Sequence, residues 1–275
     1  MAGKLSLEVF PPKPTDGIEH IYDCLDGLAK LEPTFISVTY NAGVAVSGLT
    51  SEVCKAIITR YGIPSVAHLT CAGATKDSIQ KQLLIFKNAG IKNILALRGD
   101  LSPEKQLIDY SYATDLMKDI NDYGGFTLLG SCYPEGHLES SSPEKDIEVM
   151  KLKDDLGVKT FLSQLFFDNS KFLHMVDIAR SIGVKGEIEA GIMPITSAKS
   201  LKRMVGLCGA SITKEVEKFV EKYEDDNESL TKAGIEFAIG QIRYLMDNGC
   251  DAIHLYAMNN VSVASGIVEG VKDII

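Results

Sequence analysis

Eight short apolar runs recur along the chain, and each of them closes in polar residues or in residues that could take part in catalysis. Successive runs begin 27 to 34 residues apart, except for the last gap of 65 residues. A strand, a loop, a three-turn helix and a second loop need about 30 residues, which is the length of one βα unit. The runs are 5–10, 35–39, 65–70, 93–98, 127–133, 160–167, 187–193 and 252–258.

Eight units of this length predict an α/β fold, a (β/α)8 TIM barrel that forms one domain over residues 1–275. The long last gap holds three stretches with helical periodicity, 199–208, 212–224 and 228–248, so extra helices are expected before the eighth strand. Active sites in this fold lie at the C-terminal ends of the strands. The polar residues that close each run are therefore the candidates for function.

Helix start signals fall between the runs. Thr15 and Asp16 precede one helical pattern and Thr75 precedes another, and such side chains accept hydrogen bonds from the first backbone N–H groups of a helix. Ser142 is followed by Pro143, which places a cap residue before a proline at the first helical position. These signals therefore predict the alternation of strands and helices that a βα repeat requires.

The composition of the chain argues against some classes of binding partner. The chain is 45% hydrophobic and 24% charged, as expected of a globular protein with a full core. Its net charge of −9 argues against binding to a nucleic-acid backbone, which depends on clustered lysine and arginine. No apolar stretch approaches the ~20 residues of a membrane span, and the run that starts at Leu5 leaves no room for a signal peptide. We therefore expect a cytoplasmic protein that binds neither nucleic acid nor membrane.

The cysteines and histidines do not match a metal-binding pattern. The six cysteines contain no C-x-x-C pair and no zinc-ligand spacing, so reduced thiols are expected. His68 and Cys71 close the third run, and His137 and His254 are the only other histidines at predicted strand ends. Since a metal site would need further ligands from several strands, we expect no metal.

Glu8 in the first run is a candidate for acid–base chemistry. Side chains alternate along a strand, so Leu7 and Val9 point one way and Glu8 points the other. Because helices cover the outside of a barrel, Glu8 should point inward near the upper rim. Apolar surroundings raise the pKa of a carboxyl group, which suits a general acid near neutral pH. A structural glutamate paired with a barrel lysine or arginine fits the position equally well.

The fourth and sixth runs also end in candidate binding groups. Arg98 could hold a phosphate, Gly99 lets the backbone approach a ligand, and Asp100 adds a charge beside them. Gln164 stands among apolar residues, where an amide either reads the hydrogen-bonding edge of a ligand or satisfies barrel backbone groups. The chain has no G-x-G-x-x-G after a strand, no P-loop and no G-x-S-x-G, so the usual nucleotide and hydrolase signatures are missing.

Nine strand-end motifs, taken in their order along the chain, resemble those of the methylenetetrahydrofolate reductase family. The likeness runs from the first predicted strand to the eighth and so covers nearly the whole chain. The motifs are LEVFPP (7–12), SVTY (37–40), AHLTC (67–71), ALRGD (96–100), YATDL (112–116), CYPEGH (132–137), SQLFFD (163–168), GIMP (191–194) and HLYAMN (254–259).

The resemblance implies a flavoenzyme of one-carbon metabolism. In that family FAD binds at the strand ends, NAD(P)H reduces the flavin and departs, and 5,10-methylenetetrahydrofolate then takes its place and is reduced to 5-methyltetrahydrofolate. Glu8 looks like the general acid that protonates N10 of the folate, Asp100 like the aspartate that meets the pterin and tunes the flavin, and Gln164 like the glutamine that reads the pterin edge. Contacts to FAD would fall on Thr39, His68, Arg98, Gly99, Asp100, Tyr112, Ala113, Tyr133, His137, Asp146 and Lys153.

Three positions depart from the pattern of better-known bacterial members. Ser200 stands where those members have a glutamine, Met204 where they have an aromatic residue, and Asn260 where they have an arginine. Ser200 and Asn260 are nevertheless the expected substrate-side positions. The departures imply that the FAD half of the site is intact and that the half contacting folate and nicotinamide has changed.

Two alternatives remain beside this interpretation. The same flavin barrel could be one subunit of an assembly and take electrons from a partner flavoprotein or iron–sulfur protein instead of NADH or NADPH. A flavin-free barrel, either a small-molecule lyase or a binding protein, belongs to another class. We also expect a homo-oligomer.

Overall fold

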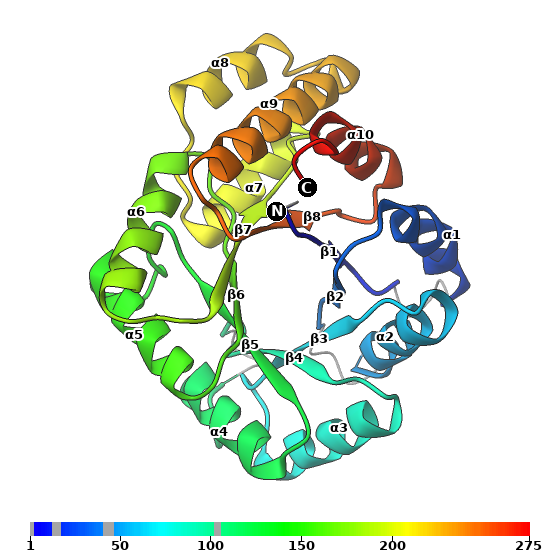
Figure 1. Cartoon of the computed structure of the whole chain (residues 1–275), viewed down its shortest axis with the longest axis vertical. Helices are drawn as coiled ribbons and strands as arrows, with labels where there is room; N and C mark the ends of the chain where they lie inside the picture. The colour runs from blue at the N-terminus through cyan, green and yellow to red at the C-terminus, as the bar shows by residue number, and fades with distance from the viewer. Residues whose placement is uncertain (1–2, 13–17, 41–46, 102–105) are drawn as a thin grey trace. The chain divides into compact units, whose positions relative to one another are not determined.

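The computed structural model describes residues 3–12, 18–40, 47–101 and 106–275 of the chain. Its eight strands pair in chain order as a closed parallel barrel with helices between them (Figure 1). The predicted (β/α)8 fold class is therefore confirmed.

The strands begin where the apolar runs predict, within one residue. They are β1 (Leu5–Val9), β2 (Ile36–Val38), β3 (Ser65–Thr70), β4 (Asn93–Leu97), β5 (Thr127–Cys132), β6 (Thr160–Ser163), β7 (Glu187–Ile192) and β8 (Ala252–Tyr256). All except β3 end earlier than predicted, because the residues that close the runs leave the ladder. The largest correction concerns 164–167, which the sequence assigned to the sixth strand and which lie beyond the end of β6.

Helices follow the strands in the expected alternation. They are α1 (Glu19–Leu28), the 3-10 turn η1 (Ala29–Leu31), α2 (Ser47–Tyr61), α3 (Lys76–Asn88), α4 (Ala113–Tyr123), α5 (Pro143–Asp155), α6 (Asn169–Ser181), α7 (Ala198–Cys208), α8 (Lys214–Lys222), α9 (Asn227–Asp247) and α10 (Val261–Val271). Three of them, α7, α8 and α9, match the helical stretches predicted before the eighth strand.

Two of the predicted caps can be compared with the structure. The side chain of Thr75 accepts a hydrogen bond from the backbone N–H of Ser78 and so caps α3, and α5 begins at Pro143. Thr15 and Asp16, which were expected to cap the first helix, lie outside the described residues.

Backbone contacts divide the chain into two compact units. The β1–β5 unit consists of Ser6–Ser131 and Leu152–Thr160, and the β6–β8 unit of Met1–Leu5, Cys132–Lys151 and Phe161–Ile275.

Register in the β1–β5 unit decides which side chains share a face. Glu8 pairs with Ser37, and Ser37 with Val66, across the parallel strands β1, β2 and β3. Leu7 and Val9 on the other face are fully buried. Paired residues in a sheet point the same way and alternate along each strand, so His68, two residues after Val66, lies on the face of Glu8.

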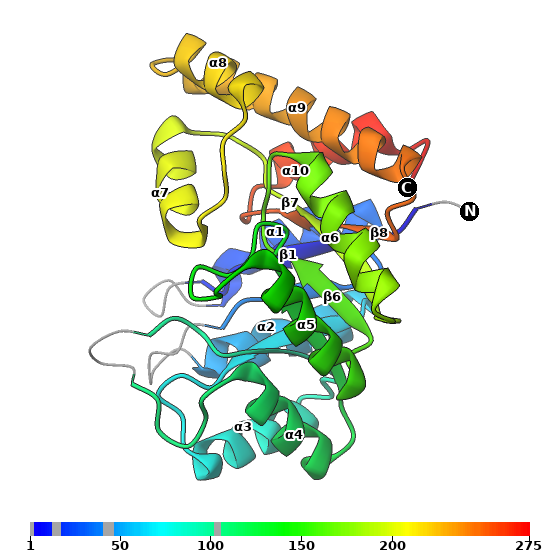
Figure 2. The same ribbon diagram turned by 90° about the vertical axis from the view of Figure 1, so that its left-hand side faces the viewer.

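The β6–β8 unit contains the inserted helices. Figure 2 shows α8 lying along α9, with α7 nearby. A buried apolar cluster joins these helices to the segments that follow β6 and β7. A Cβ atom at Gly234 of α9 would lie 1.9 Å from the carbonyl oxygen of Ile195, so this helix lies in close backbone contact with the segment after β7. The insertion therefore supports the strand ends of its unit.

Candidate functional site

Glu8, near the end of β1, lies beside His68 of β3. Its Oε2 is 3.4 Å from Nε2 of His68, and the two side chains are 12% and 8% exposed. The hydroxyl of Ser37 donates to the same oxygen over 3.5 Å. Among the contacts of Glu8 is therefore an ion pair with an imidazole, a group that can exchange a proton with a carboxyl.

Thr39 follows β2 with its backbone held on both sides. Its N–H donates to the carbonyl oxygen of Val9 over 3.1 Å. Its own carbonyl oxygen accepts the hydroxyl hydrogen of Thr50, which is fully buried on α2, over 2.9 Å. The strand end that carries Thr39 is therefore fixed against both β1 and α2.

The segment after β4 brings Arg98, Gly99 and Asp100 to the end of the strand. The carbonyl oxygen of Arg98 accepts the N–H of Ala72 over 2.7 Å, which joins this segment to the one after β3. Gly99 has a φ of +84°, and a Cβ there would lie 3.0 Å from Cβ of Thr70. Only glycine adopts this conformation without strain, and its lack of a side chain lets the segment pass close to Thr70, next to the exposed Asp100.

The start of α4 is held in place by Asp115. The carboxylate of Asp115 accepts the N–H groups of Ser111 and Tyr112, each over 3.1 Å, and this fixes the turn into the helix. The side chain of Tyr112 is 66% exposed, and Ala113 is the first residue of α4. Backbone N–H groups at a helix N-terminus favour anionic ligands, phosphate among them. Since Asp115 already accepts the N–H groups of Ser111 and Tyr112, an anion would meet the N–H groups of the first turn, which begins at Ala113. Together with Arg98 these groups fit the phosphates of a dinucleotide cofactor such as FAD.

Lys153 on α5 belongs to the β1–β5 unit and is buried. Its ammonium group donates to the carbonyl oxygen of Ser131 over 2.7 Å and lies 3.4 Å from the hydroxyl of the same residue. A cation is thereby placed at the end of β5. The phosphate contact expected of Lys153 stays a prediction.

In the β6–β8 unit, Tyr133 and His137 follow β5 and pack edge to face, with ring centroids 5.0 Å apart. The N–H of Glu139 donates to Nδ1 of His137 over 3.2 Å. Because Nδ1 accepts this hydrogen bond, the neutral imidazole carries its proton on Nε2. A ligand at this side chain therefore meets a hydrogen-bond donor.

Glu135 in the same loop was not singled out by the sequence analysis. Its carboxylate pairs with the ammonium group of Lys171 on α6 and accepts the N–H of Ser211 over 2.9 Å. This contact ties the loop between Tyr133 and His137 to the connection between α7 and α8. The sequence signal was the glutamate within the CYPEGH motif itself, since a charged side chain in a strand-end loop needs a partner.

Gln164, directly after β6, is held on both its backbone and its side chain. Its N–H donates to the carbonyl oxygen of Cys132 over 2.8 Å. Its Oε1 accepts the backbone N–H of Leu165 over 2.9 Å. Since a backbone N–H can only donate, the atom facing it must be the amide oxygen. The amide NH2 is therefore the group that Gln164 can present to a ligand.

The remaining expected site residues lie at helix starts. Asp146 is half-buried in the first turn of α5, and Ser200 is exposed in the first turn of α7. Met204 packs against the apolar cluster of the inserted helices. The side-chain oxygen of Asn260 accepts the N–H of Val263 over 3.1 Å and caps α10, so Asn260 would turn its amide nitrogen toward a ligand.

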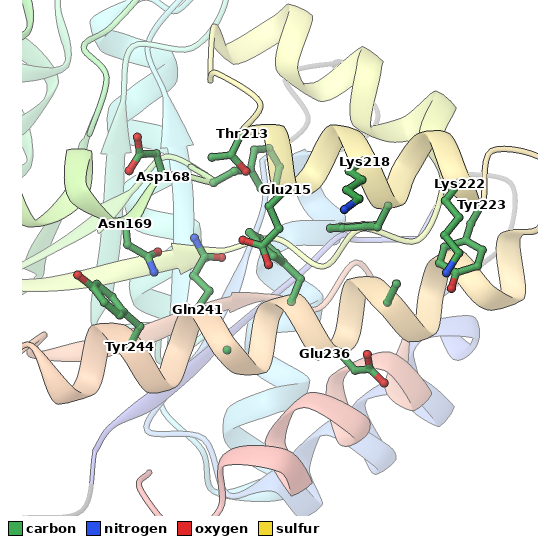
Figure 3. A pocket seen from close by; sticks show the side chains of 15 residues that line it. Asp168, Asn169, Thr213, Glu215, Lys218, Lys222, Tyr223, Glu236, Gln241 and Tyr244 are labelled. Carbon is green, nitrogen blue, oxygen red and sulfur yellow. The ribbon is translucent and has the colours of Figure 1, made fainter.

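A cavity of about 820 Å³ lies between α8, α9 and the start of α6 (Figure 3). Phe167, Phe219 and Phe237 line it together with lysine and acidic side chains, and none of the expected site residues does. Within the described residues no cluster of three or more His, Cys, Asp or Glu side chains could hold a metal ion. In the same part of the chain no helix combines the length and the apolar character needed to cross a membrane.

Comparison with known proteins gives a match over almost the full chain. A family model described as "Methylenetetrahydrofolate reductase" matches residues 2–272. Methylenetetrahydrofolate reductase (NADH) 1 of Arabidopsis thaliana is 33% identical over 281 residues, which cover 96% of this chain and 47% of the plant protein. The 5,10-methylenetetrahydrofolate reductase of Escherichia coli K12 is 31% identical over 263 residues, which cover 96% of this chain and 88% of the bacterial protein. The chain thus spans about half the length of the plant relatives.

A solved structure shares the fold at lower identity. It is described as an "Uncharacterized protein from Clostridium thermocellum" that "binds two copies of 5-methyl-5,6,7,8-tetrahydrofolic acid". It superposes with a TM-score of 0.69 at 16% identity, covering 99% of this chain and 95% of that chain. At this level of identity the likeness concerns the fold.

Proposed function

The chain belongs to the methylenetetrahydrofolate reductase family, and from this premise we propose that it reduces 5,10-methylenetetrahydrofolate to 5-methyltetrahydrofolate. FAD is the proposed hydride carrier and NADH or NADPH the proposed donor. The names of the plant relatives specify NADH, which favours that donor. The tetrahydrofolate bound by the Clostridium thermocellum protein is the same class of ligand.

The observation that carries the proposal is the nearly buried pair of Glu8 and His68, 3.4 Å apart. Reduction of the methylene bridge requires N10 of the folate to be protonated, so that the five-membered ring opens to an iminium that accepts hydride. In the proposal Glu8 delivers this proton as the general acid. His68 and Ser37 hold the carboxyl in place, and the imidazole of His68 offers a route for returning the proton.

FAD, when bound, would accept hydride from the nicotinamide and pass it on to the folate. In the β1–β5 unit we assign it Thr39, His68, Arg98, Gly99, Asp100, Tyr112, Ala113 and Lys153, and in the β6–β8 unit Tyr133, His137 and Asp146. The guanidinium of Arg98 and the N-terminus of α4 supply donors for phosphate oxygens. The N–H at Nε2 of His137 adds a donor for a further acceptor on the cofactor.

The substrate side of the proposal depends on fewer groups. We assign the amide NH2 of Gln164 to an acceptor on the pterin edge, and the carboxylate of Asp100, next to Gly99, to the pterin. Ser200 and Asn260 are shorter than the family residues at their positions, so their contacts to folate would be weaker or would pass through water.

A partner redox protein is the second candidate for the electron donor. The observation in its favour is Met204, which packs into the cluster of the inserted helices at the position where better-known bacterial members carry an aromatic residue.

We further propose that the protein is a homo-oligomer and that it is cytoplasmic. Its six cysteines are all free thiols, which agrees with a cytoplasmic location. Light scattering after size exclusion tests the oligomeric state.

A spectrum of the purified protein tests the proposal. We expect a flavin spectrum, and acid precipitation should release the flavin into the supernatant because no covalent attachment is proposed. Anaerobic NADH or NADPH should bleach the flavin, and methylenetetrahydrofolate should restore its colour. Bleaching by dithionite alone, with recolouring by the folate, would favour the partner protein as donor. A protein that stays colourless after FAD is added would contradict the proposal.

A further inference from the structure

The end of β6 departs from a regular ladder at Ser163. In a parallel sheet a backbone N–H normally donates to a carbonyl oxygen of the neighbouring strand. Here the N–H of Gly191 on β7 donates to the side-chain oxygen of Ser163 over 2.8 Å. The carbonyl oxygen of Ser163 accepts instead the hydroxyl hydrogen of Tyr256, at the end of β8, over 2.7 Å.

Gly191 is what allows Tyr256 to reach across β7. A Cβ atom at Gly191 would lie 2.2 Å from the carbonyl oxygen of Ser163 and 2.9 Å from the hydroxyl oxygen of Tyr256. Either approach is shorter than real Cβ contacts. The ring of Tyr256 is braced by His254, with centroids 5.4 Å apart and an interplanar angle of 84°. The contact is therefore built into three strands.

The same contacts fix the next residue, Gln164. The hydroxyl of Ser163 donates to the carbonyl oxygen of Gln164 over 3.0 Å, while the N–H of Gln164 is held by Cys132. With both flanking peptides held, the side chain is positioned so that its Oε1 meets the N–H of Leu165. The direction of the amide NH2 thus depends on the orientation of the peptide that joins Ser163 to Gln164.

We propose that Tyr256 is a positioning residue that acts through Ser163 to aim the amide of Gln164. Without its hydroxyl, the carbonyl of Ser163 loses a donor and turns toward the N–H of Gly191, which restores the regular ladder. That rotation carries Gln164 with it and breaks the bond from Leu165. The effect on folate rests on the proposed function, in which Gln164 binds the pterin, whereas the effect on Leu165 does not.

The test compares Tyr256→Phe with a matched control, Tyr244→Phe, on α9. Hydrogen exchange of the Leu165 amide is measured in the holoenzyme, followed by steady-state kinetics with methylenetetrahydrofolate and by the rate of flavin reduction. In Tyr256→Phe we expect the Leu165 amide to exchange at least several-fold faster. The KM for folate should rise roughly 3- to 10-fold, the effect of one hydrogen bond, with flavin reduction unchanged. Tyr244→Phe should change none of these.

A double variant separates positioning from direct contact. In a Gln164→Leu background, Tyr256→Phe should raise the KM no further, because its effect passes through Gln164. An additive rise would show that Tyr256 contacts the ligand itself and would overturn the proposal, as would unchanged exchange at Leu165. Ser163→Ala keeps the backbone carbonyl that Tyr256 holds and removes only the hydroxyl that contacts Gly191 and Gln164. If Tyr256→Phe does not fold, Leu165 exchange that stays near wild type in Ser163→Ala would support positioning through the carbonyl, and exchange that is several-fold faster would overturn it. Gln164→Leu by itself could leave the KM for folate unchanged, while the single variant Tyr256→Phe still speeds Leu165 exchange. In that case Gln164 does not bind folate, but Tyr256 still positions its amide.

Discussion

The Oε2 atom of Glu8 and the Nε2 atom of His68 lie 3.4 Å apart at the end of the first strand of the β1–β5 unit. Sixty residues separate them along the chain, and strand register brings them to one face. An imidazole can donate a proton to a carboxyl or accept one from it, so His68 is a neighbour to which Glu8 could pass a proton. This pair therefore gives the sharpest test of the proposed chemistry.

Replacing Glu8 with glutamine should slow only the folate half-reaction. Glutamine keeps the shape and hydrogen bonding of the side chain but has no transferable proton. General acid catalysis contributes about 10²- to 10⁴-fold, or about 3–5.5 kcal/mol of barrier. Stopped-flow measurement should show reoxidation of the reduced flavin by methylenetetrahydrofolate at least about a hundredfold slower, with flavin reduction within a few-fold of wild type.

A control distinguishes loss of the acid from loss of the fold. Glu187→Gln, at the start of β7 where Glu187 pairs with Lys4, should leave both half-reactions near wild type. FAD content and melting temperature should stay close to wild type in Glu8→Gln. Equal slowing of both half-reactions, or loss of the flavin, would make Glu8 a structural residue.

The tautomer of His137 predicts which substitution FAD binding tolerates. Its Nδ1 accepts the N–H of Glu139, so Nε2 carries the donor that faces outward. Glutamine can place an amide N–H near the Nε2 position, whereas asparagine reaches only the Nδ1 position. In titrations of the flavin-free protein, His137→Gln should keep most of the affinity for FAD. His137→Asn should weaken binding by roughly tenfold, the upper range for one hydrogen bond. The opposite order would mean that the ligand contact lies elsewhere on the ring.

Two glycines of α9 should respond to alanine in opposite ways. At Gly234 the new Cβ would lie 1.9 Å from the carbonyl oxygen of Ile195, whereas at Gly240 nothing lies within 4 Å. Gly234→Ala forces backbone apart and should lower the free energy of unfolding by about 1–3 kcal/mol or more. Gly240→Ala should raise it by about 0.5–1 kcal/mol, because alanine loses less entropy in a helix. Urea unfolding measures both, and a similar loss in the two variants would contradict the close approach of α9.

Burial of Cys54 predicts a loss of stability in alkali. Cys54 is fully buried on α2, and burial raises the pKa of its thiol from 9.0 to about 12. The thiol has a higher pKa in the folded state than in the unfolded state, so burying it neutral does not reduce the free energy of unfolding below pH 9.0. As the pH rises from 9.0 toward 12, the unfolded state gains stability by ionising this thiol and the free energy of unfolding falls. Cys54→Ala should therefore show a shallower fall in the free energy of unfolding between pH 8 and pH 10, by at most about 1.4 kcal/mol per pH unit.

A second cysteine provides the comparison for that measurement. Cys208 is only half-buried, and its pKa is raised as well, by burial. Cys208→Ala should flatten the pH dependence less than Cys54→Ala does. Equal slopes in wild type and Cys54→Ala would mean that the thiol ionises in the folded state as easily as in the unfolded one.

The order of apolar runs was enough to predict the barrel, the start of each strand within one residue, and the three helices before β8. These features depend on local periodicity and caps, such as Thr75 before α3, which each segment carries in its own residues. The motifs at the strand ends likewise identified Glu8 and Gln164 as candidates and carried the family resemblance.

Only the tertiary structure decided how those candidates are held. It paired Glu8 with His68, set the orientation of the Gln164 amide and brought Tyr256 to Ser163. No local sequence pattern encodes the relative direction of these groups. The early end of β6 has the same origin, because residues 164–167 are as apolar as a strand but their hydrogen bonds go elsewhere. Strand order, register and the missing side chain at Gly191 set these distances, since a hydrogen bond tolerates only a few tenths of an ångström.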